Sequence, residues 1–230
     1  MRTIPYTVVR LDPARAPLRL AARPGAHGAL LQWSVDDAPA DAAVTLNAGQ
    51  FTDAGPWGRV VHRGREHRPP GVGPLSSALV VDGADLAAVR RAGGVAEALQ
   101  SYPTLLVADD VVPAALHRGA AAIDLEHRDA RLAVRELRDG RLLVRLTRFD
   151  GLGVPFSSLP LGLTTPETAA LLGALGARRT VMLDGGLSGQ LLVRDDAGDA
   201  RRWPGLRRVP LGLVAGGGEE RVPCPVPRGA

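Results

Sequence analysis

Residues 161–193 constrain the fold of this chain more than any other segment. The pair Thr164-Thr165 can cap a helix, and Pro166 fits the first turn of that helix. Glu167 stands where a capping box needs a carboxylate, and Gly176 is placed to end the helix. The segment therefore predicts one short, well-delimited helix that leads directly into a strand.

The strand after this helix ends on an acidic, glycine-rich turn. Val181–Leu183 is apolar, the turn reads Asp184-Gly185-Gly186-Leu187-Ser188, and Leu191–Val193 forms a second apolar run. An acidic residue at a strand end, beside glycines that let backbone approach a ligand, predicts a functional site. The alternative is a turn aspartate that bonds its own backbone. The residues alone leave both interpretations open.

Short strands account for most of the rest of the chain. Asp139-Gly140 between two alternating apolar runs is typical of a β-hairpin. The expected strands are 7–11, 18–22, 44–46, 79–81, 104–108, 131–137, 141–147 and 209–214.

Two further segments have a less regular pattern. Residues 86–100 carry apolar side chains at helical spacing, but Gly93-Gly94 interrupts them, so we expect a broken helix. The glycine- and proline-rich residues 55–74 are expected to form a loop. Because strands and helices do not alternate regularly, the sequence predicts an α+β fold with a mixed sheet and a few helices. We expect a single domain over residues 1–215 and a Gly/Pro-rich tail over 216–230.

Composition excludes several classes of protein. The single cysteine, Cys224, rules out an intrachain disulfide and a multi-cysteine zinc site. A net charge of +4, carried by dispersed arginines with only 3% aromatic residues, argues against a nucleic-acid partner. The abundance of Arg, Ala and Gly suggests a bacterial source.

The hydrophobic pattern also bears on location. No apolar run approaches membrane-spanning length, which predicts a soluble protein. The first residues lack a signal-peptide core, so the chain as written is expected in the cytoplasm. An exported protein without its leader would give the same sequence.

Two motif-like stretches are weak. Gly186-Leu187-Ser188-Gly189 lacks the spacing and the strand-to-helix context of a nucleophile elbow. Residues 62–67, His-Arg-Gly-Arg-Glu-His, lack the helix that would align zinc ligands, which favours a solvated loop.

Several segments, in the right order, resemble the motifs of the phosphodiester glycosidase family. The resemblance covers roughly residues 7–214, and the helix followed by Asp184-Gly185-Gly186 is its most specific part. That helix spans 163–176, and the other matching segments are 47–51 (Asn-Ala-Gly-Gln-Phe), 97–107, 130–134 with Asp139-Gly140, and 208–210 (Arg-Val-Pro).

The sequence departs from the family pattern at five positions, each with a larger side chain. They are Ala48, Tyr102, Leu132, Arg135 and Leu187. The added bulk near the expected pocket implies a different substrate or a loss of activity.

The resemblance implies hydrolysis of the glycosidic bond of a sugar-1-phosphodiester. The phosphate leaving group carries negative charge well, so this reaction needs less help from a general acid than ordinary glycoside hydrolysis. It does need a cation for the phosphate, which Arg131 suits, and a carboxylate for the oxocarbenium-like centre, which Asp184 suits. Glu167 is the reserve carboxylate.

The remaining site residues are expected to bind substrate. Asn47 would hold sugar hydroxyls, and Ser188 with backbone amides of the glycine turn would hold phosphate oxygens. The full set is Asn47, Gly49, Arg131, Gly185, Gly186 and Ser188. We expect a small-molecule or glycan phosphodiester as partner and no required cofactor. The sequence leaves open a divalent cation near Asp184, the oligomeric state, and a non-catalytic relative that binds a glycan or phosphorylated sugar.

Overall fold

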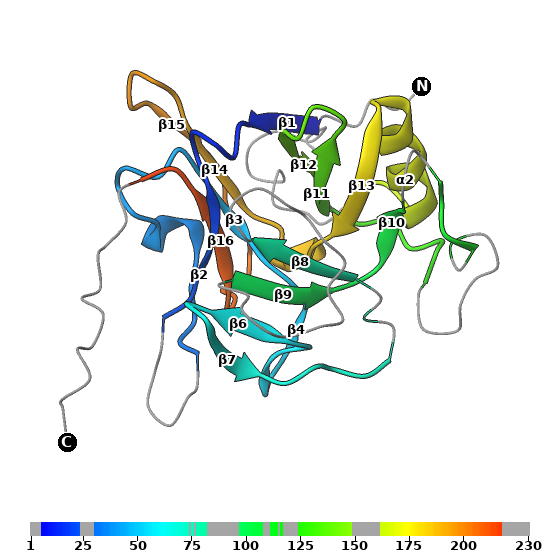
Figure 1. Cartoon of the computed structure of the whole chain (residues 1–230), viewed down its shortest axis with the longest axis horizontal. Helices are drawn as coiled ribbons and strands as arrows, with labels where there is room; N and C mark the ends of the chain where they lie inside the picture. Colours follow the sequence, from blue (N-terminus) through cyan, green and yellow to red (C-terminus); the bar gives the residue numbers. More distant parts are fainter. Residues whose placement is uncertain are drawn as a thin grey trace.

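The computed structural model describes residues 6–23, 30–73, 75, 77–81, 97–107, 111–114, 116, 124–148 and 162–217. Within these residues the chain forms two five-stranded sheets, one four-stranded sheet and one two-stranded sheet (Figure 1). Every strand pairing described is antiparallel.

The first sheet has the strand order β1-β12-β11-β13-β10. Its strands are β1 (Tyr6–Leu11), β12 (Leu142–Thr147), β11 (Arg131–Leu137), β13 (Ala177–Met182) and β10 (Thr104–Leu106). The hairpin predicted at Asp139-Gly140 is confirmed, because β11 pairs with β12 and Gly140 takes the left-handed φ of 77°. This sheet carries Arg131 at the start of β11 and leads to Asp184 just after β13.

The second sheet has the strand order β15-β14-β3-β16-β2. Its strands are β15 (Ala200–Trp203), β14 (Leu191–Arg194), β3 (Val44–Asn47), β16 (Gly212–Ala215) and β2 (Leu18–Ala21). The predicted strands at 18–22, 44–46 and 191–193 are thus found within one or two residues, and they meet in one sheet.

A third sheet has the strand order β7-β6-β9-β8, and a short pair, β4-β5, stands apart from it. The bounds are β7 (Arg65–Arg68), β6 (Val60–His62), β9 (Glu97–Ser101), β8 (Ser77–Val81), β4 (Phe51–Thr52) and β5 (Gly55–Pro56). Two short 3-10 helices, η2 (Val35–Asp37) and η4 (Gly186–Ser188), also lie within the described residues.

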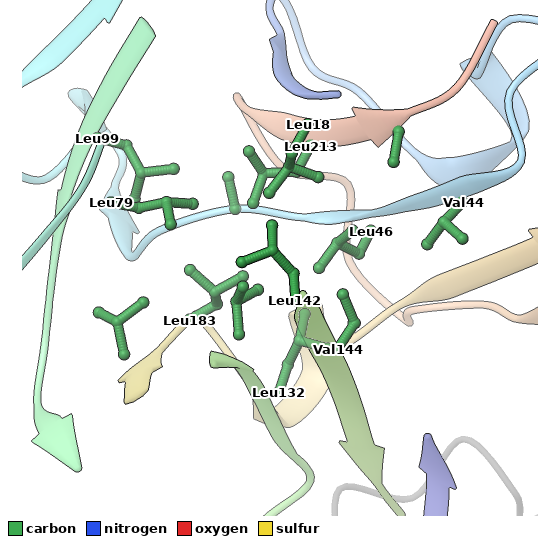
Figure 2. Packing of buried hydrophobic residues seen from close by; sticks show 14 of the residues in the cluster. Leu18, Val44, Leu46, Leu79, Leu99, Leu132, Leu142, Val144, Leu183 and Leu213 are labelled. Atoms are coloured by element: carbon green, nitrogen blue, oxygen red, sulfur yellow. The ribbon is translucent and has the colours of Figure 1, made fainter. Parts of the chain in front are cut away.

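The main core lies where these three sheets face one another. Alternate residues of β11 and β12 point to it, as the two-residue period of a strand requires. Leu142 packs among leucines and valines of the other strands (Figure 2). Those labelled there are Leu18, Val44, Leu46, Leu79, Leu99, Leu132, Val144, Leu183 and Leu213. Since the chain has few aromatic residues, branched aliphatic side chains supply most of this buried apolar surface.

The helix α2 (Thr165–Ala174) packs on β10 and β13 (Figure 1). The predicted capping box is confirmed, because the Thr164 hydroxyl accepts from the Glu167 N–H and the Glu167 carboxylate accepts from the Thr164 N–H. Buried Arg135 donates to the carbonyls of Leu172 and Leu175 at the other end, at 2.8 and 2.9 Å. A cation at these carbonyls matches the negative end of the helix dipole.

The predicted α+β class with a mixed sheet is wrong, because the described residues are mostly antiparallel strand. Only α2 is an α-helix that lies wholly within the described residues. The end of the expected broken helix forms β9 instead, which pairs with β6 and β8. Residues 82–96 of that segment lie outside the described residues. The expected loop 55–74 contributes β5, β6 and β7.

None of the helices described in the structure is both long and apolar enough to cross a membrane. The division between a domain over 1–215 and a tail over 216–230 stays a prediction, since residues 218–230 lie outside the described residues.

Candidate functional site

Asn47 holds the turn that carries Asp184. Its side-chain amide donates to the Asp184 carbonyl at 2.7 Å, and its Oδ1 accepts from the Gln190 N–H at 2.9 Å. The Asp184 N–H donates to the Ala48 carbonyl at 3.0 Å. The end of β3 therefore binds both ends of the turn. Asn47 is fully buried, so the structure gives it a contact with the turn, and its contact with sugar hydroxyls stays a prediction.

The two glycines let the turn lie against the start of β11. The Gly186 N–H donates to the Ala130 carbonyl at 2.9 Å. A Cβ on Gly185 would lie 2.2 Å from that same oxygen, closer than any side chain permits. Gly186 adopts a φ of +56°, and a Cβ there would lie 2.7 Å from Oδ2 of Asp129. The sequence predicted that these glycines would let the backbone approach a ligand. In the structure, Gly185 lets the turn approach the protein's own backbone at Ala130.

Burial raises the pKa of the Asp184 carboxyl from its ordinary value to about 6. The negative charge of Asp129 raises this pKa too. Hydrogen bonds from the Ser188 hydroxyl and the Gly185 N–H act in the opposite direction, as does the positive charge of Arg207. This carboxyl is therefore mostly ionised at neutral pH, with a pKa close enough to neutrality for an acid-base or electrostatic role.

Arg131 lies beside the turn and is nearly buried, with 9% of its surface exposed. Its Nε donates to the Leu163 carbonyl at 3.0 Å and its Nη2 to the His127 carbonyl at 2.5 Å. Burial lowers the pKa of Arg131, and the charge of Asp129 opposes that change. The two carbonyls fix the guanidinium plane. Phosphate binding by Arg131 stays a prediction.

Asp129 is a carboxylate that the sequence analysis did not single out. Its Oδ1 accepts from the Ala130 N–H at 2.9 Å, and its Oδ2 lies 3.6 Å from Nε2 of His127. Burial raises the pKa of this carboxyl, and the charge of Arg131 lowers it. A signal was available in the sequence, since Asp129 stands two residues before Arg131 and so on the same side of an extended chain.

Tyr102 and Arg207 both interact with the charge of Asp184; the sequence marked Tyr102 only as a bulky departure from the family motif and did not single out Arg207. The charge of Asp184 raises the pKa of the Tyr102 phenol, though burial contributes more, and the charge of Arg131 lowers it. The Tyr102 ring meets the Trp57 ring edge to face, with centroids 5.3 Å apart. The Arg207 guanidinium lies 4.7 Å above the centroid of the Phe51 ring. Tyr102 and Arg207 are therefore close enough to Asp184 for its charge to act on them, and each lies beside an aromatic ring.

Gln50 fixes the backbone that carries Tyr102. Its Oε1 accepts from the Ser101 hydroxyl at 2.9 Å, and its Nε2 donates to the Tyr102 carbonyl at 2.7 Å. The single proton of this hydroxyl is shared with the Met182 carbonyl oxygen, which lies 2.6 Å from it just before the Asp184 turn. The ends of β3, β9 and β13 are thus joined by hydrogen bonds.

Glu167 and Gly49 make other contacts. The Glu167 carboxylate forms a bidentate pair with Arg128 at 2.6 and 2.8 Å and caps α2, and both interactions lower its pKa. A Cβ on Gly49 would lie 3.0 Å from the Leu99 side chain, so this glycine allows β3 and β9 to approach. A catalytic role for Glu167 and substrate binding by Gly49 stay predictions.

The stretch with two histidines is not a solvated loop. His62 ends β6, and Arg65–Arg68 forms β7 after a tight turn in which Arg63 and Gly64 have φ values of 52° and 71°. In the described part of the chain, no group of three or more His, Cys, Asp or Glu side chains could hold a metal ion. Whether the reaction needs a divalent cation stays untested.

The raised pKa of Asp184 predicts a pH-dependent stability. Between its ordinary value of 3.8 and its folded value of about 6, the folded protein keeps a proton that the unfolded chain releases. Stability should therefore fall as the pH rises through this window, by up to about 3 kcal/mol. Asp184→Asn lacks this group. In urea unfolding, its free energy of unfolding relative to that of the wild type should therefore increase from about pH 4 to about pH 8. An equal difference at both pH values would contradict the raised pKa.

Comparison with known proteins identifies the family. A model of the phosphodiester glycosidase family matches residues 40–215. The chain therefore belongs to the phosphodiester glycosidase family, and this membership supports a glycosidase-type activity. No curated protein matches the sequence significantly.

Two solved structures have a similar fold. One is the zebrafish N-acetylglucosamine-1-phosphodiester alpha-N-acetylglucosaminidase catalytic domain, auto-inhibited by its pro-peptide. It has a TM-score of 0.63 and 14% identity, over 94% of this chain and 84% of that one. The other is a hypothetical protein from Synechocystis, with a TM-score of 0.60 and 17% identity, over 92% of this chain and 59% of that one. The chain thus spans less than two thirds of the Synechocystis protein. Such likeness concerns the fold, and function must be argued from the site.

The five departures from the family motifs fall in different places. Leu132 and Ala48 are fully buried in the main core, and Arg135 binds the end of α2. The larger side chains at these three positions are therefore accommodated by packing within the protein. Leu187 is about half exposed on η4, and Tyr102 is partly buried beside Asp184 and Arg131. These two side chains lie outside the main core.

Proposed function

We propose that this protein hydrolyses the glycosidic bond of a sugar-1-phosphodiester, with Asp184 as the catalytic carboxylate and Arg131 as the phosphate ligand. The observation that carries the proposal is the Asp184 carboxyl, whose pKa is raised to about 6 in a turn fixed by Asn47 and Gly185. Family membership supports the reaction class.

The charges around the turn suit the transition state of this reaction. As the bond between C1 and the phosphate oxygen breaks, positive charge grows on the sugar ring and negative charge on the phosphate. Ionised Asp184 stabilises the first, and the guanidinium of Arg131 stabilises the second. Arg131 is held by two backbone carbonyls, so its plane is set before substrate arrives. Ser188, which hydrogen-bonds to the Asp184 carboxylate, helps to keep that group ionised.

The test is hydrolysis of a panel of sugar-1-phosphodiesters beside matching p-nitrophenyl glycosides. We expect release of a phosphate monoester and free sugar from at least one phosphodiester, with slower cleavage of the glycosides. Repeating the assay with EDTA tests the need for a divalent cation, which we propose is not required. Cleavage of glycosides alone, or no cleavage by folded protein, would contradict the proposal.

A non-catalytic relative that binds a glycan or a phosphorylated sugar is the second candidate. The observation that favours it is Tyr102, a large side chain where the family motif has glycine, with its phenol near Asp184 and Arg131. Calorimetry with the same phosphodiesters distinguishes the two, because a binder would give saturable heats without product.

A further inference from the structure

We propose that Asp129 is the second carboxylate of this site and accepts the proton of the attacking water. This inference rests on the proposed function, since it assigns a residue to that reaction. Asp129 lies at the start of the segment that leads into β11, where its N–H donates to the Leu163 carbonyl at 3.3 Å.

Contact with the glycine turn places the Asp129 carboxyl at the site. A Cβ on Gly186 would lie 2.7 Å from Oδ2 and 3.2 Å from Oδ1 of Asp129. The carboxyl thus rests against the bare Cα of the glycine two residues after Asp184. Any other residue at position 186 would displace it, so the turn and the carboxyl fit each other.

The charged neighbours assign different roles to the two carboxyls. Asp184 receives hydrogen bonds from the Ser188 hydroxyl and the Gly185 N–H, and Arg207 adds positive charge, all of which favour its anion. Asp129 receives one backbone N–H and has His127 beside its Oδ2, with Arg131 as the nearby cation. Asp184 therefore suits a stable negative charge. Asp129, 20% exposed and next to the largely exposed His127, suits a group that takes up a proton and returns it to solvent.

The reaction balances with these roles. The C1–O bond breaks, and its electron pair leaves with the phosphate monoester. A water oxygen bonds to C1, and one water proton passes to Asp129. Asp184 stays ionised beside C1 throughout. Release of the proton through His127 to solvent restores the site, and the products are free sugar and a phosphate monoester.

Glu167 is less suited to this role. Its two oxygens bind Arg128 and the backbone N–H of Thr164, contacts that hold the start of α2. Taking up a proton there would break a bidentate ion pair.

The experiment compares Asp129→Asn, Glu167→Gln and Asp139→Asn on a phosphodiester that the wild type cleaves. Asparagine at 129 can still accept from the Ala130 N–H, so the local backbone is retained. We expect kcat to fall by about 10² to 10⁴-fold in Asp129→Asn. Asp139 is the matched control, an aspartate beyond the other end of β11 whose Oδ1 accepts from the Arg141 N–H at 3.1 Å. The kcat of Asp139→Asn should match that of the wild type.

The pH profile gives a readout that a purely structural role would not change. The charge of Asp129 raises the pKa of Asp184, so its removal should move the acidic limb of kcat/KM to lower pH. Arg207, the other charge that acts on the Asp184 carboxyl, remains in the variant, as do His127, Arg131 and Tyr102. Added formate should restore part of the turnover of Asp129→Ala, which separates a missing base from a misfolded site.

Three outcomes would overturn the inference. The first is a kcat of Asp129→Asn within about threefold of the wild-type value, with an unshifted acidic limb of kcat/KM. The second is a loss in Glu167→Gln that exceeds the loss in Asp129→Asn. The third is a folded Asp129→Ala that formate does not rescue. No cleavage by the wild type would instead overturn the proposed function, so the two failures are distinguishable.

Discussion

Asp184→Asn should lower kcat on the phosphodiester substrate by about 10³-fold or more while the protein stays folded. The amide matches the carboxylate in shape and can still accept from the Ser188 hydroxyl. It cannot carry the negative charge that balances the oxocarbenium-like centre. Since the pKa of Asp184 is raised to about 6 in the folded protein, loss of this ionised group should also stabilise the fold above that pH. Activity and stability should therefore change in opposite directions.

The matched control for this variant is Asp195→Asn. Asp195 lies in the exposed turn between β14 and β15, where its Oδ1 accepts from the backbone N–H groups of Ala197 and Asp199. It is a turn aspartate of the kind that the sequence left open for position 184. We expect normal turnover from it, measured by phosphate-monoester release alongside thermal melting. Near-normal turnover by Asp184→Asn would remove Asp184 from the mechanism.

The sequence predicted the elements that local chemistry determines. The capping box at Thr164 and Glu167 and the hairpin at Asp139-Gly140 depend on residues within a few positions of one another, and both are confirmed. The strand ends that carry Asn47 and Asp184 were located for the same reason.

Pairing over long distances explains the wrong fold class. Residues 86–100 carry apolar side chains at helical spacing, yet residues 97–101 lie between β6 and β8 and form β9. Strand β9 gains its hydrogen bonds from β6 and β8, which lie well before it in the chain, so its own sequence signal is weak.

Contacts between residues far apart in the chain also limited the prediction of the site. Family motifs singled out Asp184 and Arg131, and the structure brings both beside one turn. Asp129 and Arg207 join them through contacts that the linear order does not show, since Gly186 meets Asp129 and the Arg207 N–H donates to the Leu187 carbonyl. Glu167, prominent in the linear motif, is engaged by Arg128 instead.

Gly185→Ala should both destabilise the protein and reduce its activity. A Cβ at this position would lie 2.2 Å from the Ala130 carbonyl oxygen and 3.7 Å from the Arg131 Cα. Both contacts are backbone atoms, which cannot rotate away as a flexible side chain would. The turn must therefore move off β11, which weakens the bond from the Gly186 N–H to Ala130. We expect a loss of about 2 to 4 kcal/mol in unfolding free energy.

The displaced turn would also move the Asp184 carboxyl, the proposed catalytic group, from its position beside the start of β11. A misplacement of about 1 Å costs roughly 10²-fold in rate, so kcat/KM should fall at least that far. Gly173→Ala is the control, because a Cβ there meets nothing within 4 Å and α2 should gain about 0.5 to 1 kcal/mol from alanine. Urea unfolding and turnover of the two variants, measured together, separate a local clash from a general effect of adding a methyl group. Wild-type stability and rate in Gly185→Ala would mean that the Ala130 contact does not determine where Asp184 lies.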